Sequence, residues 1–183
     1  MEQNVSMKIN ELPSPTWNWL KVNETPIKWS NKIEPCEIAA EGDAVSTETE
    51  QLSDIETGAG READAIFATE NTAKYQILAD NAGQDKTVRL HISGKKDAHM
   101  AGCVEIVAKE NSTLTVVMDS RVAPDATKEE DSTAEASLAV RVRMKVESGA
   151  SVRLVQVQMP QEHETLLSDI GGNLIGEGAK VEY

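Results

Sequence analysis

Two cysteines and three histidines are the side chains of this sequence best suited to bind a metal or attack a substrate. Cys36, in IEPCEI, could act as a thiolate ligand, but no second thiol or histidine stands beside it, so we interpret it as structural. His99 and Cys103, in HMAGC, could reach one metal if the segment curled. Metal sites need three or four ligands, so we expect Cys103 to be a small buried hydrophobic residue instead.

The other two histidines have no visible catalytic companion. His91 alternates with Val88, Leu90 and Ile92 and is expected to face solvent or a neighbouring subunit, while His163 lies in the polar stretch PQEHET. Neither has a nucleophile partner for acyl transfer. The stretch GAGREAD is the nearest approach to a phosphate-binding loop, and it lacks the lysine and the strand–helix context. We therefore predict no catalytic, cofactor-binding or metal-binding residue on this chain.

A basic stripe stands out in this acidic sequence. Arg141, Arg143 and Lys145 share one face of the strand LAVRVRMKV, and Arg153 continues the stripe. We favour a solvated strand face as its explanation. The alternative is a contact surface for an acidic partner or for the acidic segments of the chain itself.

The overall charge limits the classes of partner. Asp and Glu total 31 against 18 Lys and Arg, which gives a net charge of −13. Such a charge repels phosphate backbones and anionic headgroups, so neither nucleic acid nor membrane is expected as the main partner. The sequence has no secretory signal and no apolar run long enough to span a bilayer. Because two cysteines make no disulfide framework, we expect a cytoplasmic protein.

From Ile66 onward the sequence shows the period-two alternation of half-buried strands. The segments KTVRLHI, GCVEIVA, STLTVVM and LAVRVRMKV all follow it, and Val140, Val142, Met144 and Val146 share one face of the last segment. Aromatic residues are scarce, so the core must be aliphatic.

Three strands begin with the same template, a Gly or Asn followed by a small residue and then alternating apolar positions. Gly and Asn accept a positive φ and allow a sharp corner, and the small residue leaves room for corners to stack. The small residues are Ser112, Ala150 and Ala179, so the first interval is longer than the second. This irregular repeat favours an all-β fold of the β-solenoid type, with a β-sandwich as the alternative.

We divide the chain at residue 64. Residues 1–64 are expected to form an arm, in which Leu12, Trp17, Leu20 and Ile27 line a short helix that begins at Thr16. Its acidic stretch 41–64 is interpreted as a solvated linker or a marginal helix. Residues 65–183 form the β body, with a polar loop at 121–133. The last strand stops at Tyr183 without a cap, which suggests a truncated chain or an edge closed by another molecule.

The segments LPSPTWNWLKVNETPI, VEIVAKENSTLTVVMDS and VRVRMKVESGASVRLVQVQMPQEHETLLSDIGGNLIGEGAKVEY resemble the SufB/SufD family, the scaffold proteins of the Suf iron–sulfur cluster assembly system. SufD is the more similar member because its N-terminal region is short. The resemblance implies a right-handed parallel β-helix that works with a paralogous SufB-like β-helix protein and a SufC-like ABC-type ATPase.

By this resemblance, the family's cluster-assembly and ATPase-docking residues lie beyond this sequence, so none is assigned here. A cluster would form only in the full complex, and a homodimer is left open. We therefore expect a non-catalytic scaffold subunit. The alternatives are a β-helix protein that binds or cleaves polysaccharide, for which the body has few aromatic residues, or a purely structural solenoid.

Overall fold

The computed structural model describes residues 4–10, 24–43, 51–68, 70, 72–80, 82–122 and 135–183. Most of these residues lie in β-strands. The only helical elements among them are a one-turn 3-10 helix, η1 (Arg61–Ala63), and the four-residue helix α1 (Asp64–Phe67). The described part of the chain is therefore all-β, as predicted.

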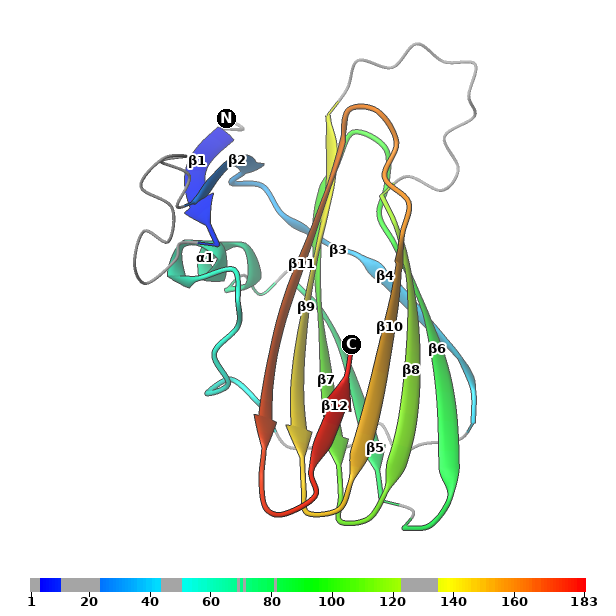
Figure 1. Ribbon diagram of the computed structural model, residues 1–183. Coiled ribbons are helices and arrows are strands. Elements are labelled where there is room, and N and C mark those ends of the chain that lie inside the picture. Colours follow the sequence, from blue (N-terminus) through cyan, green and yellow to red (C-terminus); the bar gives the residue numbers. More distant parts are fainter. Residues whose placement is uncertain are drawn as a thin grey trace, which may run out of the picture.

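Two sheets make up the body of the molecule (Figure 1). We call them the odd sheet (β3, β5, β7, β9, β11) and the even sheet (β4, β6, β8, β10, β12). From β5 onward, each strand pairs in parallel with the second strand after it, so the chain passes to the other sheet at every connection. The strands are β5 (Ala73–Ala79), β6 (Asp85–Ser93), β7 (His99–Ala108), β8 (Thr113–Arg121), β9 (Ala136–Val146), β10 (Ser151–Gln158), β11 (Glu164–Leu174) and β12 (Lys180–Glu182).

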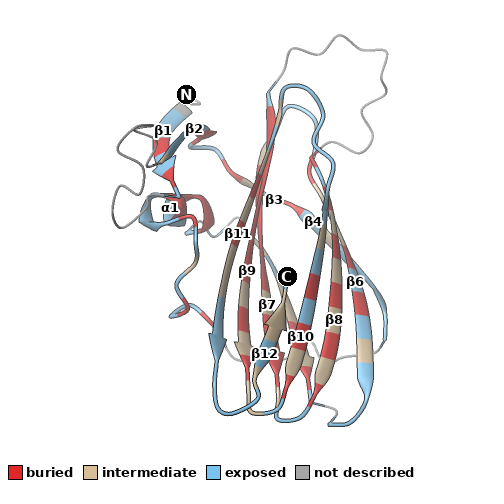
Figure 2. Cartoon of the chain, in the orientation of Figure 1, coloured by how far each residue is buried: buried red, intermediate tan, exposed pale blue. Residues whose placement is uncertain are grey.

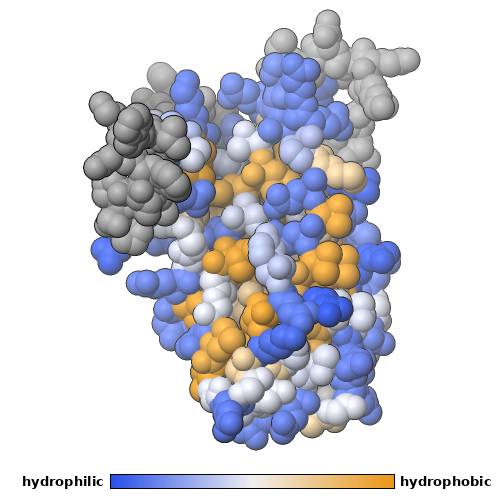
Figure 3. All heavy atoms as spheres, viewed as in Figure 1, coloured by the Kyte–Doolittle hydropathy of each residue, from blue (hydrophilic) through white to orange (hydrophobic). Residues whose placement is uncertain are grey.

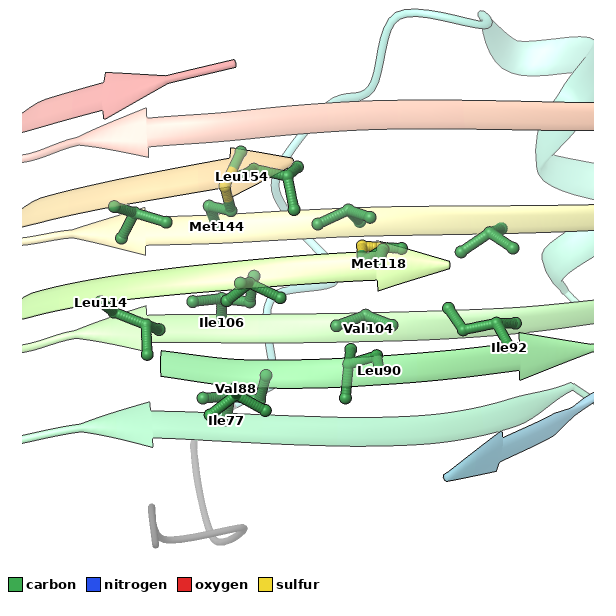
Figure 4. Packing of buried hydrophobic residues seen from close by; sticks show 14 of the residues in the cluster. Ile77, Val88, Leu90, Ile92, Val104, Ile106, Leu114, Met118, Met144 and Leu154 are labelled. Atoms are coloured by element: carbon green, nitrogen blue, oxygen red, sulfur yellow. The ribbon is translucent and has the colours of Figure 1, made fainter. Parts of the chain in front are cut away.

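One aliphatic core lies between the two sheets. Alternate residues of each strand point into it, as the banded burial of β8 in Figure 2 shows. The predicted inward faces are confirmed, because Val88, Leu90 and Ile92 of β6 are buried in the same cluster as Val104 and Ile106 of β7 (Figure 4). Full burial of each such side chain contributes about 1.5–3 kcal/mol to folding.

The strands of the even sheet pair in the register that the corner template predicts: residues that follow one corner pair with residues that follow the next. Ser151, just after the middle corner, pairs with Thr113 after the preceding corner and with Lys180 after the following one. At each corner one residue has the left-handed backbone that the template requires. These residues are Asn111 (φ 59°), Gly149 (φ 67°) and Gly178 (φ 75°).

Backbone hydrogen bonds join successive corners. The amide of Gly149 donates to the carbonyl of Glu177 at 2.9 Å, and the amide of Gly83 donates to the carbonyl of Asn111 at 3.2 Å. Gly83, with φ 76°, is thus a fourth corner that the template misses. The reason is that Gln84, rather than a small residue, follows it.

An edge strap, residues 34–42, covers the first edge of the even sheet and adds two residues to the first edge of the odd sheet, beside β5. Its strand β3 (Glu34–Pro35) pairs in parallel with β7, and β4 (Glu37–Gly42) pairs antiparallel with β6. Cys36 lies between the two strands, and its amide donates to the carbonyl of Ala101 at 3.1 Å. A Cβ on Gly102 would lie 2.4 Å from the Cys36 Sγ, so this crossing requires glycine at 102. Covering a strand edge in this way prevents uncontrolled pairing with other chains.

The first two strands form a separate antiparallel pair, β1 (Asn4–Ile9) with β2 (Thr25–Ser30). Trp29 of β2 is buried in a cluster that includes Cys103 and Ala139 on the outer face of the odd sheet, so it docks this pair onto the body. Ile27 lies in β2 and not in a helix. The helix predicted to begin at Thr16, with Leu12, Trp17 and Leu20, lies outside the described residues.

A docked segment, residues 51–68, lies against the outer face of the odd sheet. The expectation of a solvated linker over 41–64 does not hold for its described part, because several of its apolar side chains are buried. These side chains recur every three or four residues and face the sheet: Leu52, Ile55, Ala59, Ala63 and Ile66. The many acidic residues between these positions are the reason that the sequence predicts a solvated linker instead.

Candidate functional site

A row of side chains crosses the outer face of the odd sheet. Cys103 of β7 is in register with Arg141 of β9, which is in register with Asp169 of β11. In-register residues of parallel strands point to the same face, so these side chains are neighbours. The docked segment covers them and leaves the Arg141 side chain 3 % and the Asp169 side chain 0 % exposed.

Asp169 joins the sheet to the docked segment. One of its oxygens, Oδ2, accepts hydrogen bonds from Arg141 Nε and Thr57 Oγ1, both at 2.7 Å. The other oxygen, Oδ1, accepts the amide hydrogen of Ala59 at 2.8 Å. A buried carboxylate is tolerated only when its charge and its lone pairs are satisfied in this way.

The Arg141 guanidinium makes two further contacts with the docked segment. Its Nη2 lies 2.8 Å from Asp64 Oδ1 in an ion pair that lacks hydrogen-bond geometry. The guanidinium carbon also lies 4.1 Å from the centroid of the Phe67 ring, a cation–π distance. Arg141 is therefore held from three sides.

A second row lies two residues along the strands. Glu105 accepts the amide hydrogen of Leu52 at 3.3 Å and a hydrogen from Gln76 Nε2 at 2.8 Å. Arg143, in register with Glu105, donates from Nε to the carbonyl of Ile55 at 3.1 Å. Side chains of the sheet thus bind the backbone of the docked segment as well as its acidic groups.

The backbone of the docked segment approaches β11 very closely. The amide of Gly58 donates to the carbonyl of Ile170 at 3.2 Å. A Cβ on Gly171 would lie 2.1 Å from the carbonyl oxygen of Glu56, which no relaxed structure tolerates. Glycine at 171 is therefore a condition for this contact.

Two cavities lie between the docked segment and the sheet. The larger, of about 330 Å³, is lined by Lys74, Gln76, Cys103 and Glu105 from the sheet and by Phe67 from α1, among others. The smaller, of about 280 Å³, is lined mainly by residues 53–57 and 60–64. Both cavities share Asp64 and Arg143. Both are half-open clefts, and charged side chains of the sheet and of the docked segment meet in them.

Burial keeps both thiols protonated at neutral pH. Desolvation raises the pKa of Cys36 to about 12. Desolvation also raises the pKa of Cys103, although Arg141 and Arg143 oppose this rise. Cys103 is buried as predicted, but it differs from Cys36 because it also borders the larger cavity.

His99 and Cys103 are held apart by the strand. They lie four residues apart on one face of β7, about 13 Å along an extended chain, so the segment does not curl around one ion. The His99 Nδ1 lies 2.7 Å from Ser137 Oγ, and its ring centroid lies 6.2 Å from that of Trp29. In the described ranges, no group of three or more His, Cys, Asp or Glu side chains is arranged to hold a metal ion.

The remaining histidines lie on the surface, away from this region. His91 faces outward from β6, with its ring nitrogens 3.7 Å from carboxylate oxygens of Glu41 and Asp119. His163 is exposed in the turn before β11. The stretch GAGREAD, which we compared with phosphate loops, belongs to the docked segment and leads into η1.

The residues of the predicted basic stripe lie on two different sheets: Arg141 on β9 of the odd sheet and Arg153 on β10 of the even sheet. Arg141 is buried, so a solvated face is the wrong interpretation for it; the alternative, a contact with acidic residues of the chain itself, is confirmed for this arginine. Arg153 does not continue the stripe, because it lies on β10 of the even sheet. There it pairs with Glu182 of β12, with its Nη2 2.7 Å from the carboxylate.

Sequence reasoning missed Asp169, Glu105 and Asp64. A signal for Asp169 existed, since the interval from Arg141 to Asp169 nearly equals the interval between the corner residues Ala150 and Ala179. The repeat therefore places Arg141 and Asp169 side by side on neighbouring strands. Asp64 had no such signal because it precedes the repeating strands.

No helix among the described residues is long and apolar enough to cross a membrane. No protein family, no curated protein and no solved structure matches the chain.

Proposed function

We propose that this chain is a non-catalytic scaffold subunit for iron–sulfur cluster assembly, similar to SufD and acting in the cytoplasm. Its partners would be a paralogous SufB-like protein and a SufC-like ABC-type ATPase. The cluster would form in the full complex, with no cofactor held by this chain alone. The resemblance of the sequence segments described above is one support for this proposal. The surface of the last strands is the other.

We also propose that the two sheets are the faces of a right-handed parallel β-helix. Parallel pairing with the second strand along the chain supports this fold, as do the stacked corners. Crossover connections between parallel strands are right-handed in nearly all proteins, which supports the handedness. A β-sandwich of the usual kind is built from antiparallel sheets, so the same pairing weighs against that alternative.

One observation carries the scaffold proposal: the body exposes large apolar side chains on its last three strands and the turns beside them. Figure 3 shows apolar side chains on this face of the molecule. Neighbouring exposed apolar side chains are typical of surfaces that contact another protein. Val155 and Val157 are such neighbours on the outer face of β10. The other exposed apolar residues lie at the ends of the last strands: Met159, Leu174, Ile175 and Tyr183.

Co-expression with the proposed partners tests this function. A tagged chain produced together with a SufB-like protein and a SufC-like ATPase should capture both, and the purified complex should form a cluster when reconstituted anaerobically with iron and sulfide. Failure to capture either partner, in a chain whose circular dichroism shows the β-sheet fold, would refute the proposal.

A matched pair of variants locates the contact. Val157→Asp places a charge beside Val155 on the outer face of β10 and should reduce capture of the SufB-like partner by about tenfold, which corresponds to about 1.4 kcal/mol. Val5→Asp makes the same change at an exposed valine of β1, away from these strands, and should leave capture unchanged. Equal capture by both variants would show that this surface is not the contact.

A further inference from the structure

The larger cavity beneath the docked segment has the features of a small-ligand site. Its volume of about 330 Å³ lies at the lower end of the range for small-molecule pockets. The ring of Phe67 provides an apolar wall, while Gln51, Ser53 and Gln76 offer hydrogen-bonding groups. A half-open cleft with one apolar wall and several polar groups along it fits a compact polar molecule.

The charged groups that line this cavity are unevenly satisfied. The Arg141 charge is matched by Asp169 and Asp64. Glu105 is engaged by the neutral donors Leu52 and Gln76.

Two cations of the lining are not matched in this way. Arg143 contacts a neutral carbonyl, that of Ile55. Within the part of the chain that the structure describes, neither Arg143 nor Lys74 forms an ion pair with a carboxylate, although both line the cavity. Lys74 is exposed at the edge of the cavity and Arg143 is half-buried in it, so both cations are accessible to an anion from solvent.

We propose that this cavity binds a small anion, a phosphate or a short carboxylate, between Lys74 and Arg143. The planar guanidinium of Arg143 presents paired donors that match a carboxylate or a phosphate, and the Lys74 ammonium adds a mobile point charge. Glu105 sets a limit on the ligand, because its carboxylate repels a second anionic group placed beside it. This inference does not depend on the proposed scaffold function.

Cys103 offers a reporter inside the same cavity. Its thiol borders the cavity, whereas Cys36 belongs to the edge strap and its side chain packs in the core between the two sheets. A ligand that fills the cavity should therefore shield Cys103 from a maleimide. Cys36 serves as the internal control in the same molecule.

Calorimetric titration at constant ionic strength tests the proposal on the full chain. Inorganic phosphate and acetate are titrated separately, with sodium chloride as the blank, so that the two anion chemistries are distinguished. At least one should bind saturably with a stoichiometry of one. In the double variant Lys74→Gln/Arg143→Gln, its Kd should rise at least about tenfold. Arg89→Gln, a cation on the outer face of β6, is the matched control and should leave Kd within about twofold.

Absence of saturable binding for both anions, or equal binding by the double variant, would overturn the proposal. Because the double variant removes a contact to Ile55 and could disturb the docked segment, the unmodified protein provides a second measurement. Mass spectrometry of maleimide-labelled peptides should show that the bound anion slows labelling of Cys103 and leaves Cys36 unaffected. An unchanged rate at Cys103 would also overturn the proposal.

Discussion

Two arginine–carboxylate pairs join neighbouring strands, one on each sheet, and they differ most in how far they are covered. Arg141 and Asp169 are in register on β9 and β11, and Arg153 and Glu182 are in register on β10 and β12. The Nε to oxygen distances are 2.7 Å and 2.8 Å. The first pair is 3 % and 0 % exposed, whereas the second is 62 % and 36 % exposed.

This difference arises from the docked segment, which lies over the odd sheet. On that face an ion pair is part of a buried network that also holds the backbone of residues 55–59. The Arg153 pair, with similar geometry, remains in water, where screening and side-chain entropy cancel most of its energy. An arginine–carboxylate pair therefore contributes to structure on one face and mainly to solubility on the other.

The largest expected effect comes from breaking the covered pair. Asp169→Asn leaves the Arg141 charge buried with only a partly exposed partner, Asp64, so we expect the free energy of unfolding to fall by about 3–5 kcal/mol. Urea denaturation of the variant measures this change. The matched variant Glu182→Gln on the uncovered pair should leave the free energy of unfolding nearly unchanged, because solvent screens an exposed ion pair. Similar losses for both variants would remove the distinction between the two faces.

A second comparison uses adjacent glycines of β11. Gly171→Ala forces a Cβ against the carbonyl oxygen of Glu56 and should destabilise the protein by about 1–3 kcal/mol. Gly172→Ala places a Cβ at ordinary contact distance, 3.8 Å from Met144, and should have little effect. Limited proteolysis within residues 51–64 should accelerate in the first variant only. If both variants are cleaved at the wild-type rate, the close approach of the docked segment is wrong.

The buried Cys36 thiol makes the stability of the fold depend on pH in the alkaline range. Because burial raises the pKa of Cys36 from 9.0 to about 12, the folded state keeps a proton that the unfolded state loses. The stabilisation is complete below pH 9 and is lost as the pH rises toward 12, by up to about 1.4 kcal/mol per pH unit.

Urea denaturation of the wild type and of Cys36→Ala at several pH values between pH 8 and about pH 10 measures this contribution. It appears as a difference between the two proteins in the slope of the unfolding free energy against pH. The wild type should lose stability more steeply above pH 9, where the unfolded thiol ionises. Equal slopes would show that the Cys36 thiol is not desolvated by the edge strap.

The smallest effect concerns acid pH on the uncovered face. Hydrogen bonds from Lys180 and Arg153 lower the pKa of Glu182. A carboxylate with a lowered pKa stabilises the fold above its unfolded pKa and loses this contribution as the pH falls through the folded pKa. NMR titration of the Glu182 carboxyl carbon should show a midpoint below 4.5, which returns toward 4.5 in Arg153→Gln. An unchanged midpoint in that variant would exclude Arg153 as a cause.

Local patterns account for what the sequence predicts correctly. Period-two alternation locates the inward faces of β6 to β9, because each such strand buries one face in the shared core. The corner template locates the register, because only Gly or Asn adopts the required φ without strain. These signals act over a few residues and need no knowledge of distant partners.

Such local patterns do not predict that residues 51–68 cover the outer face of the odd sheet. Arg141 and Arg153 look alike in the sequence, and what separates them is a segment of the chain that lies over only one of them. The buried side chains of that segment, such as Leu52 and Ile55, stand among acidic residues that suggest a solvated linker. Docking of this kind depends on contacts between parts of the chain that are distant in the sequence, such as that between Ala59 and Asp169.

Amide hydrogen exchange at Gly58 and Ala59 tests the docked segment most directly. These two amides donate to the carbonyl of Ile170 and to the carboxylate of Asp169. If residues 51–68 cover the odd sheet, both amides should be protected in the native protein and lose protection in Asp169→Asn. Exchange at the rate of an unstructured peptide in the wild type would contradict the covered face.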